Sequence, residues 1–192
     1  MAKLRKKLAV SNAKFVAAMD AINQKALDME DVVRGVFLAI LAGGRLEFSG
    51  RPVGEHVFLI GPPGVGKSYV MDLAMSCFVI GKEDTYKYLF HQFSAPEEIL
   101  GDVDVKRMLG QHERARKVAG YLPAAKFAVL DEIWKSGPVS TALLNIVNER
   151  KFRNGDDGEI DCPLITALAA SNEYPSNPMD CLLYTSDAAD EE

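Results

Sequence analysis

The chain of 192 residues is poor in cysteine and has no long apolar run. Its three cysteines, Cys77, Cys162 and Cys181, are odd in number and far apart, so they indicate neither a disulfide framework nor a metal site. No apolar run approaches the roughly 18 residues that cross a bilayer. The basic start MAKLRKKLAV is followed by no long apolar stretch or cleavage site. We therefore expect a cytoplasmic protein without a membrane span.

An excess of positive charge is also missing. The formal net charge is −5, and four of the negative charges lie in the last six residues (Asp187, Asp190, Glu191 and Glu192), which leaves −1 for the rest. This balance, without a basic stripe, argues against nucleic acid as a partner. The contents of 48% apolar and 26% charged residues are typical of a soluble globular protein, and the length suits one domain.

The stretch HVFLIGPPGVGKSYVMDLAM carries a complete phosphate-binding pattern. Gly61, Gly66, Lys67 and Ser68 match Gly, four residues, Gly-Lys and Ser or Thr. The preceding apolar run 57–60 suits a buried parallel strand, and the residues after Ser68 have helical spacing. A simple Gly/Pro turn before an amphipathic helix is the alternative. The strand, loop and helix context favours a nucleotide site.

Each part of this loop has a chemical task in such a site. Gly64 and Gly66 allow backbone N–H groups to turn inward around phosphate oxygens, at the positive end of the following helix. Lys67 is expected to reach the β- and γ-phosphates. The hydroxyl of Ser68 is expected to coordinate Mg²⁺.

Polar residues follow two further apolar strands. FAVLDEIW ends in Asp131, expected to hold the magnesium shell, and Glu132, expected to orient or deprotonate the attacking water. LITALAASNEYP places Asn172 where its amide can bond both the γ-phosphate and that water. Ligands of open α/β sheets bind at the carboxyl ends of parallel strands, so we expect these clusters to share one site in a doubly wound sheet.

The remaining pattern predicts further elements. They are a helix capped by Ser11 or Asn12, a helix carrying Val32 to Leu41 and stopped by Gly43-Gly44, a hairpin within 45–55, a strand over 89–93, a helix starting at Ala95 with Ser94 and Glu97 as a capping box, and strands over 127–130 and 164–170.

With these motifs the chain resembles the AAA+ ATPases, with GPPGVGKS as Walker A, FAVLDE as Walker B and Asn172 as the sensor-1 residue. The segments FSAPEEILG, GYLPAAKFAVLDEIWKSGPVSTALLNIVNERKFRNG and LAASNE resemble the MoxR family, and within it the RavA type, over about 30–44 and 56–178.

The resemblance implies an α/β fold, a P-loop NTPase (AAA+) three-layer sandwich with a mainly parallel sheet. It implies ATP and Mg²⁺ as ligands and extends the nucleotide-binding loop over Gly61, Pro62, Pro63, Gly64, Val65, Gly66, Lys67, Ser68 and Tyr69. It also implies a chaperone-like ATPase, a homo-hexamer when full length, that remodels or assembles complexes with a protein carrying a von Willebrand factor A (vWA) domain.

Two departures from the family pattern stand out. The connection 45–55 is longer than the usual link, and no arginine finger, fifth strand or helical lid with sensor 2 follows Asp180. Arg150 and Arg153 are interpreted as surface or inter-subunit charges, with contact to a neighbouring subunit's nucleotide as the alternative. We expect residues 1–180 to form an incomplete AAA+ nucleotide-binding subdomain. The tail CLLYTSDAADEE (181–192) resembles a translated sequencing adapter and is predicted to be non-native; a genuine acidic C-terminus is the alternative.

Two functional interpretations remain open. The first is an ATP hydrolase that drives remodelling of a partner, which Glu132 favours. The second is a nucleotide-binding scaffold with negligible hydrolysis in this form, which the missing arginine finger favours because such a finger supplies roughly 10³–10⁵ in rate. A DNA-processing machine is disfavoured by the acidic balance.

Overall fold

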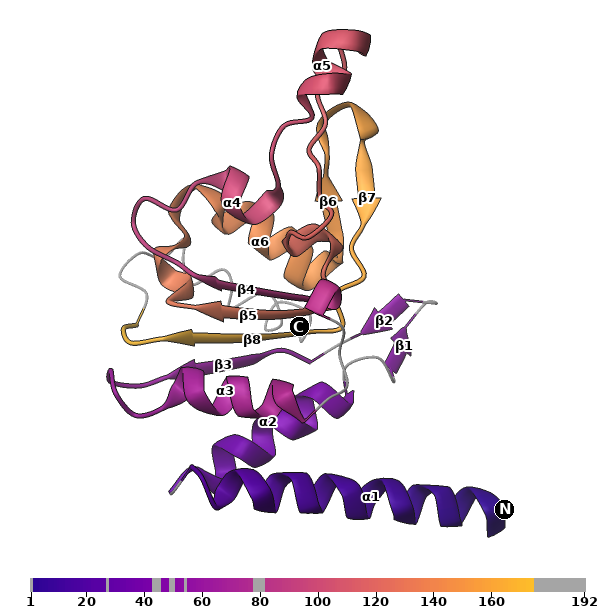
Figure 1. Ribbon diagram of the computed structural model, residues 1–192, viewed down its shortest axis with the longest axis vertical. Helices are drawn as coiled ribbons and strands as arrows, with labels where there is room; N and C mark the ends of the chain where they lie inside the picture. The colour runs from indigo at the N-terminus through magenta and orange to yellow at the C-terminus, as the bar shows by residue number, and fades with distance from the viewer. Residues whose placement is uncertain are drawn as a thin grey trace, which may run out of the picture.

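Helices and strands alternate along the computed structural model, which describes residues 2–26, 28–42, 46–48, 51–53, 55–77 and 82–174 (Figure 1). Six α-helices are present in this part of the chain: α1 (Ala2–Asn23), α2 (Glu30–Ala42), α3 (Lys67–Ser76), α4 (Pro96–Leu100), α5 (Val105–Gln111) and α6 (Ser140–Leu144). Its strands are β1 (Leu46–Phe48), β2 (Arg51–Val53), β3 (Val57–Ile60), β4 (Thr85–Leu89), β5 (Phe127–Asp131), β6 (Lys151–Arg153), β7 (Glu159–Asp161) and β8 (Thr166–Ser171). Short 3-10 turns and one π-helical turn, η4 (Asn145–Glu149), complete these elements.

The central sheet has four parallel strands in the order β3-β8-β5-β4. In its register Ile60 lies beside Ser171, and Asp131 lies beside both Ala170 and Leu89. The carboxyl ends of all four strands therefore meet at one edge, which confirms the predicted α/β fold with a mainly parallel sheet.

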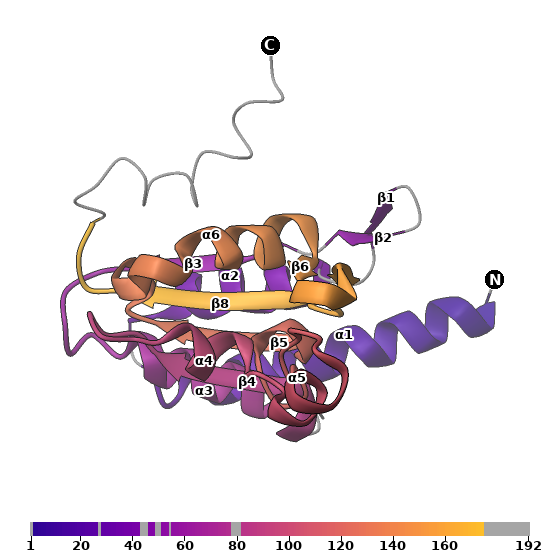
Figure 2. The ribbon, with the colours of Figure 1, turned by 90° about the horizontal axis from the view of Figure 1, so that it is seen from above.

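Helices cover both faces of this sheet and make three layers (Figures 1 and 2). One face packs against α2 and α3 through a core that includes Val129, Leu168 and Ala170, and α1 lies on the outer side of these two helices (Figure 1). The other face packs against α4 and α6 through Leu130 and Ala169. Alternate residues of a strand point to opposite faces, so a run buried on both sides is apolar throughout. All six residues of β8 are buried.

A histidine fixes the amino end of the sheet. His56 shares a 3.0 Å hydrogen bond with the Val147 carbonyl through Nε2, and its Nδ1 accepts a 2.9 Å bond from the Ala167 amide. Burial, together with the nearby charge of Arg150, lowers the pKa of His56 to about 4 although the bond to Val147 acts in the opposite direction. The ring is therefore neutral near pH 7 and links β8 to η4.

The helical predictions near the N-terminus are partly wrong. Helix α1 begins at Ala2, so Ser11 and Asn12 lie inside it and do not cap it. The second helix is confirmed as α2, and the hairpin within 45–55 is confirmed as the antiparallel pair of β1 and β2. Gly43 and Gly44 lie outside the described residues.

The strand predicted over 89–93 is displaced. Strand β4 ends at Leu89, and the chain then turns, with the His91 amide donating to the Ser94 hydroxyl at 2.9 Å. Ser94 and Glu97 form no capping box, because the amide of Ala95 donates to Glu98 instead, at 3.1 Å. The helix start itself is correct, since α4 follows Ala95 directly.

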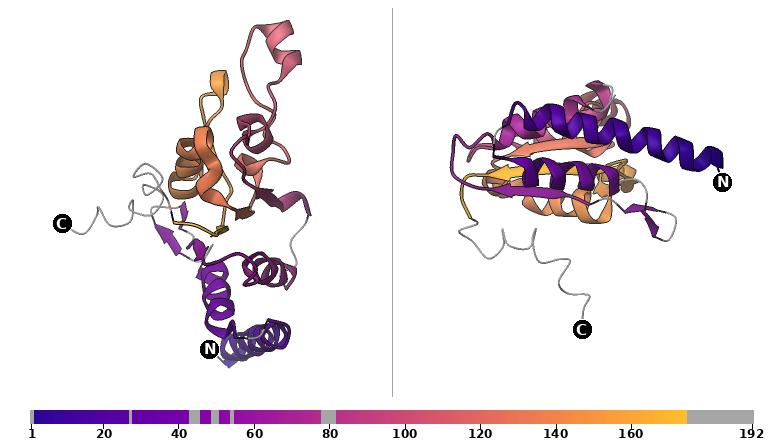
Figure 3. Two further views of the ribbon diagram at one scale, coloured as in Figure 1. Left: turned by 90° about the vertical axis from the view of Figure 1, so that its left-hand side faces the viewer. Right: turned by 90° about the horizontal axis from the view of Figure 1, so that it is seen from below.

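Two segments form an arm, defined as residues 102–117 with helix α5 and residues 151–161 with the hairpin β6–β7. The arm extends away from the sheet on the side of α4 and α6 (Figures 1 and 3). Among the described residues, no helix is long and apolar enough to cross a membrane. The predicted absence of a lid and the predicted non-native tail 181–192 concern residues beyond 174 and lie outside the described residues.

Candidate active site

The phosphate-binding loop joins β3 to α3. Gly64 and Gly66 have φ of 84° and 86°, a left-handed conformation that strains any other residue, and a Cβ built at Gly64 would meet no atom within 4 Å. Helix α3 then begins at Lys67, so its free N–H groups and positive dipole end face the loop. The backbone thus leaves an open cradle where an anion can approach.

The ammonium group of Lys67 is held at the mouth of this loop. Its side chain is only 7% exposed, and it donates hydrogen bonds to the carbonyl oxygens of Gly61 (2.7 Å) and Pro62 (2.9 Å) and to Oδ1 of Asn172 (2.7 Å). A buried cation needs such partners because desolvation is costly. In this arrangement protein oxygens occupy the positions around the ammonium that phosphate oxygens can take.

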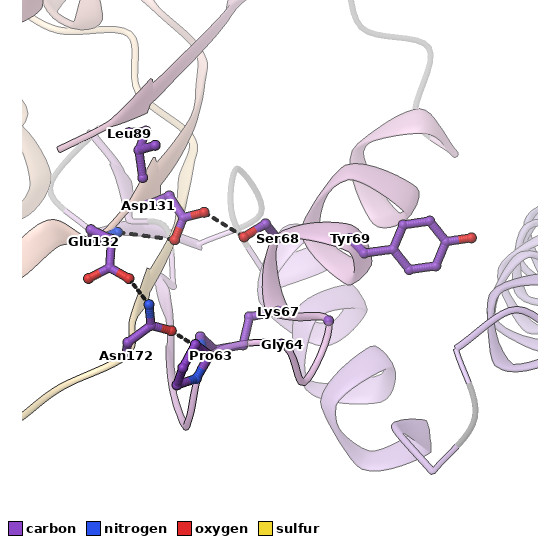
Figure 4. Close-up of a pocket in the computed structure, with 10 residues that line it drawn as sticks. Pro63, Gly64, Lys67, Ser68, Tyr69, Leu89, Asp131, Glu132 and Asn172 are labelled. Atoms are coloured by element: carbon purple, nitrogen blue, oxygen red, sulfur yellow. Dashed lines mark hydrogen bonds between the residues drawn. The ribbon is translucent and has the colours of Figure 1, made fainter.

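A hydroxyl and a carboxylate lie side by side at the ends of α3 and β5. Ser68 donates a 2.5 Å hydrogen bond from Oγ to Oδ2 of Asp131, and Oδ1 of Asp131 accepts from the Glu132 amide at 3.1 Å (Figure 4). Both side chains present oxygen, which is the ligand type that Mg²⁺ prefers.

Glu132 has an unusual backbone and a carboxylate with a partner on each oxygen. Its φ of 54° lies in the left-handed region, which is uncommon for a residue other than glycine. One carboxylate oxygen accepts a hydrogen bond from Nδ2 of Asn172, and the other lies 3.2 Å from Nζ of Lys135. Asn172 therefore bridges Glu132 to Lys67, and the three side chains form one polar chain.

These side chains face a cavity of about 390 Å³ at the carboxyl ends of the strands. Nine of the twelve predicted site residues line it, together with Leu89: Pro63, Gly64, Gly66, Lys67, Ser68, Tyr69, Asp131, Glu132 and Asn172. Gly61 and Pro62 do not line it but contribute carbonyl oxygens to Lys67. Val65 also lies outside the lining, and its exposed side chain turns toward Gly61.

The residues present fit a nucleotide phosphate group with Mg²⁺. The open cradle at Gly64, the helix start and the Lys67 ammonium suit phosphate oxygens. Ser68 and Asp131 would hold the metal.

Sequence reasoning missed two residues near the site. Leu89 lines the cavity because β4 ends there, four residues before the predicted end of the strand. Lys135 pairs with Glu132 across a spacing of three residues, a pairing that helical spacing makes possible but that depends on the turn after β5.

The interpretation of Arg150 as a surface charge needs correction. Arg150 is buried at the end of η4, where burial lowers its pKa, so it is not a surface charge. Arg153 is exposed in β6, as expected for a surface charge. Neither lines the cavity.

Comparisons with known proteins agree with this geometry. A model of the MoxR domain in the MoxR-vWA-beta-propeller ternary systems matches residues 13–184. Two uncharacterized proteins of Methanocaldococcus jannaschii are each 37% identical over 122 residues, which cover 63% of this chain and 31% and 32% of theirs. A structural protein of Acidianus two-tailed virus is 31% identical over 137 residues, covering 70% of this chain and 22% of that protein. The chain thus spans about a third or less of the length of these relatives.

Proposed function

This chain belongs to the MoxR family of AAA+ ATPases, and on that premise we propose that it binds Mg-ATP in the cavity at the strand ends and hydrolyses it. The observation that supports this proposal is the polar chain Lys67, Asn172 and Glu132 beside the pair of Ser68 and Asp131. It combines a phosphate cradle, two metal-ligand candidates and a carboxylate that can act as a base.

Each residue has a distinct task in the proposed reaction. Lys67 exchanges its bonds to protein oxygens for bonds to the β- and γ-phosphate oxygens, while the backbone around Gly64 and Gly66 positions the phosphates. Ser68 and Asp131 would hold Mg²⁺, which would supply positive charge beside the transferring phosphoryl group.

Water activation is the task of the remaining pair. Glu132 accepts a proton from the attacking water, and Asn172 orients that water with its amide. The Lys67–Asn172 bond places the amide oxygen beside the group that meets the γ-phosphate. Loss of the Lys67–Asn172 bond when phosphate binds would therefore move Asn172, and with it the hydrogen bond from Asn172 to Glu132.

Within the described residues no arginine lines the cavity, although the transition state of phosphoryl transfer gains from one. We propose that a neighbouring copy in a ring, a homo-hexamer in the full-length protein, supplies this cation. We further propose that the cycle remodels or assembles a complex with a vWA-domain protein, because the matching family model describes MoxR domains of MoxR-vWA-beta-propeller systems. The narrower likeness to RavA-type members remains a prediction.

One observation favours a second candidate function, a nucleotide-binding scaffold with negligible hydrolysis. Each carboxylate oxygen of Glu132 has one partner in this arrangement, Asn172 or Lys135, and these partners compete with the attacking water for the carboxylate. In such a scaffold, nucleotide binding changes the shape or assembly of the protein without turnover.

One titration separates these candidates. The only tryptophan, Trp134, lies two residues after Glu132 and packs on Phe58, with ring centroids 4.8 Å apart, so its emission can report binding. Saturable, magnesium-dependent change with ATP and release of phosphate support the hydrolase. The same change without phosphate release supports the scaffold. If no saturable binding occurs up to millimolar ATP, neither proposal holds.

A further inference from the structure

The arm presents an apolar helix face to solvent. Helix α5 has no buried residue, and its side chains Val105 (52% exposed), Met108 (37%) and Leu109 (73%) are open to water. Their spacing of three and four residues places them on one face of the helix. Figures 1 and 3 show that the arm stands away from the layers of the core, which could otherwise cover this face.

This helix is too short to be stable by its own hydrogen bonds, since isolated helices below about 12 residues are marginal in water. It is held by Arg107, which donates two hydrogen bonds to Asp157 (3.0 and 2.7 Å) and two to Glu113 (3.2 and 2.5 Å). Asp104 also caps its first turn through the amides of Lys106 and Arg107.

The two halves of the arm are also tied through the hairpin turn. Asn154 accepts a 2.7 Å bond from the Arg116 amide and donates at 2.9 Å to Asp157. Gly155 lies so close to the Arg114 carbonyl that a Cβ there would be 1.8 Å from its oxygen. The apolar face thus lies on a unit that is already ordered, so binding of a partner requires little further loss of conformational entropy in the arm.

Charge indicates the chemistry of that partner. Lys106 lies on α5 beside the apolar face and Arg114 follows the helix; both are exposed, and neither makes an ion pair with another described residue. Two nearby acids, Glu113 and Asp157, are paired with Arg107, whereas Asp156 accepts a hydrogen bond from the neutral Arg114 amide and keeps its charge. Two unpaired cations thus accompany the apolar face.

We propose that the arm is a docking surface for a partner protein, and that its occupant is an acidic segment with apolar side chains. The apolar groups of that segment cover Val105, Met108 and Leu109, and its carboxylates pair with Lys106 and Arg114. An anionic membrane fits less well, because membrane-binding basic clusters contain about 4–8 cations. The choice of a vWA-domain protein as the partner tested rests on the proposed function.

The test measures binding of the full chain to the purified vWA-domain protein of a MoxR-vWA-beta-propeller system by calorimetry, at low and high salt. We expect Leu109→Ser to weaken binding at least roughly tenfold at both salt concentrations, as for a central apolar contact. The double variant Lys106→Glu with Arg114→Glu should weaken binding mainly at low salt, because salt screens exposed charges.

The matched control is Val16→Ser, which alters an exposed apolar residue of α1 outside the arm; it should bind as the unaltered chain does. Thermal unfolding checks that the variants fold. Equal binding by Leu109→Ser, no binding by the unaltered chain, or Leu109-dependent binding to phosphatidylserine vesicles instead would overturn the proposal.

Nucleotide titration of the same variants, followed by Trp134 emission, separates this proposal from the proposed function. The arm variants should bind ATP normally. If neither the unaltered chain nor any variant binds nucleotide but partner binding still depends on the arm, the nucleotide site is refuted and the docking surface is not.

Discussion

The ammonium group of Lys67 donates a 2.7 Å hydrogen bond to Oδ1 of Asn172, a residue 105 positions later in the chain. Lys67 starts α3 and Asn172 directly follows β8, so the bond links the phosphate-binding loop to the sheet. In the proposed site, phosphate oxygens would compete with Asn172 for the same donor. Binding of nucleotide should therefore change the environment of Asn172 directly.

Replacing Lys67 by Ala is expected to abolish ATP binding at micromolar concentrations, because Lys67 is the only cation among the described residues that line the cavity. Calorimetry measures the dissociation constant. The control is Lys87→Ala, which removes an exposed lysine of β4 that pairs with Asp72 of α3; it should leave binding unchanged. An unchanged dissociation constant for Lys67→Ala would remove this residue from the site.

Replacing Glu132 by Gln should leave Mg-ATP binding intact and slow hydrolysis by about 10²–10⁴ in the full-length protein, the range attributed to a general base. The amide still accepts a hydrogen bond but cannot take the proton of the water. Phosphate release under saturating ATP measures the effect, with the exposed Glu149→Gln as the matched control. Undiminished turnover would rule out the role proposed for Glu132.

Replacing Asp131 by Asn should weaken the dependence of ATP binding on magnesium. Of the two proposed metal ligands, Ser68 and Asp131, only Asp131 carries a charge, and the substitution removes it. Titration of ATP with and without Mg²⁺, read by Trp134 emission, gives the ratio of the two affinities. The ratio should fall toward one in the variant. A ratio equal to that of the unaltered protein contradicts the metal role.

His56 predicts a stability that falls in mild acid. Its pKa of 6.5 in the unfolded chain drops to about 4 in the fold, so between these values the unfolded state binds more protons than the native state. The contribution of the neutral ring is complete above pH 6.5 and is lost as the pH falls toward 4. The slope is at most about 1.4 kcal/mol per pH unit.

Urea unfolding at several pH values measures this slope. His56→Gln should be less stable near pH 7 and should show a smaller loss of stability between pH 6.5 and 4. His112→Asn, at an exposed position with φ of 58° that Asn tolerates, is the control and should keep the slope. An equal slope in His56→Gln would show that other groups cause it.

The strand ends that carry the site could be predicted because their signals are local. The apolar runs before Gly61, Asp131 and Asn172 are long enough to bury, and parallel strands bring their carboxyl ends together whatever their order. The phosphate loop adds a fixed spacing with a known backbone conformation, and the structure has that conformation at Gly64 and Gly66.

The errors arise where tertiary contacts decide. The aromatic run around Phe93 predicts a strand, yet Phe93 is 80% exposed and β4 ends where its partner β5 ends, at Asp131. The residue that bonds the Ala95 amide is Glu98 and not Glu97, because the helix is capped at Ala95, one residue later than the predicted cap at Ser94. The pairing of Lys135 with Glu132 depends on a left-handed residue that no local pattern signals.

Strand β8 connects the arm to the candidate active site. Its amino end follows the β6–β7 hairpin of the arm after four residues, its carboxyl end leads into Asn172, and between them it is bonded to a strand on each side. The arm and the amide that contacts Lys67 and Glu132 are therefore joined through one strand that is fixed by a neighbour on each side, so we expect a displacement of the arm to shift this amide.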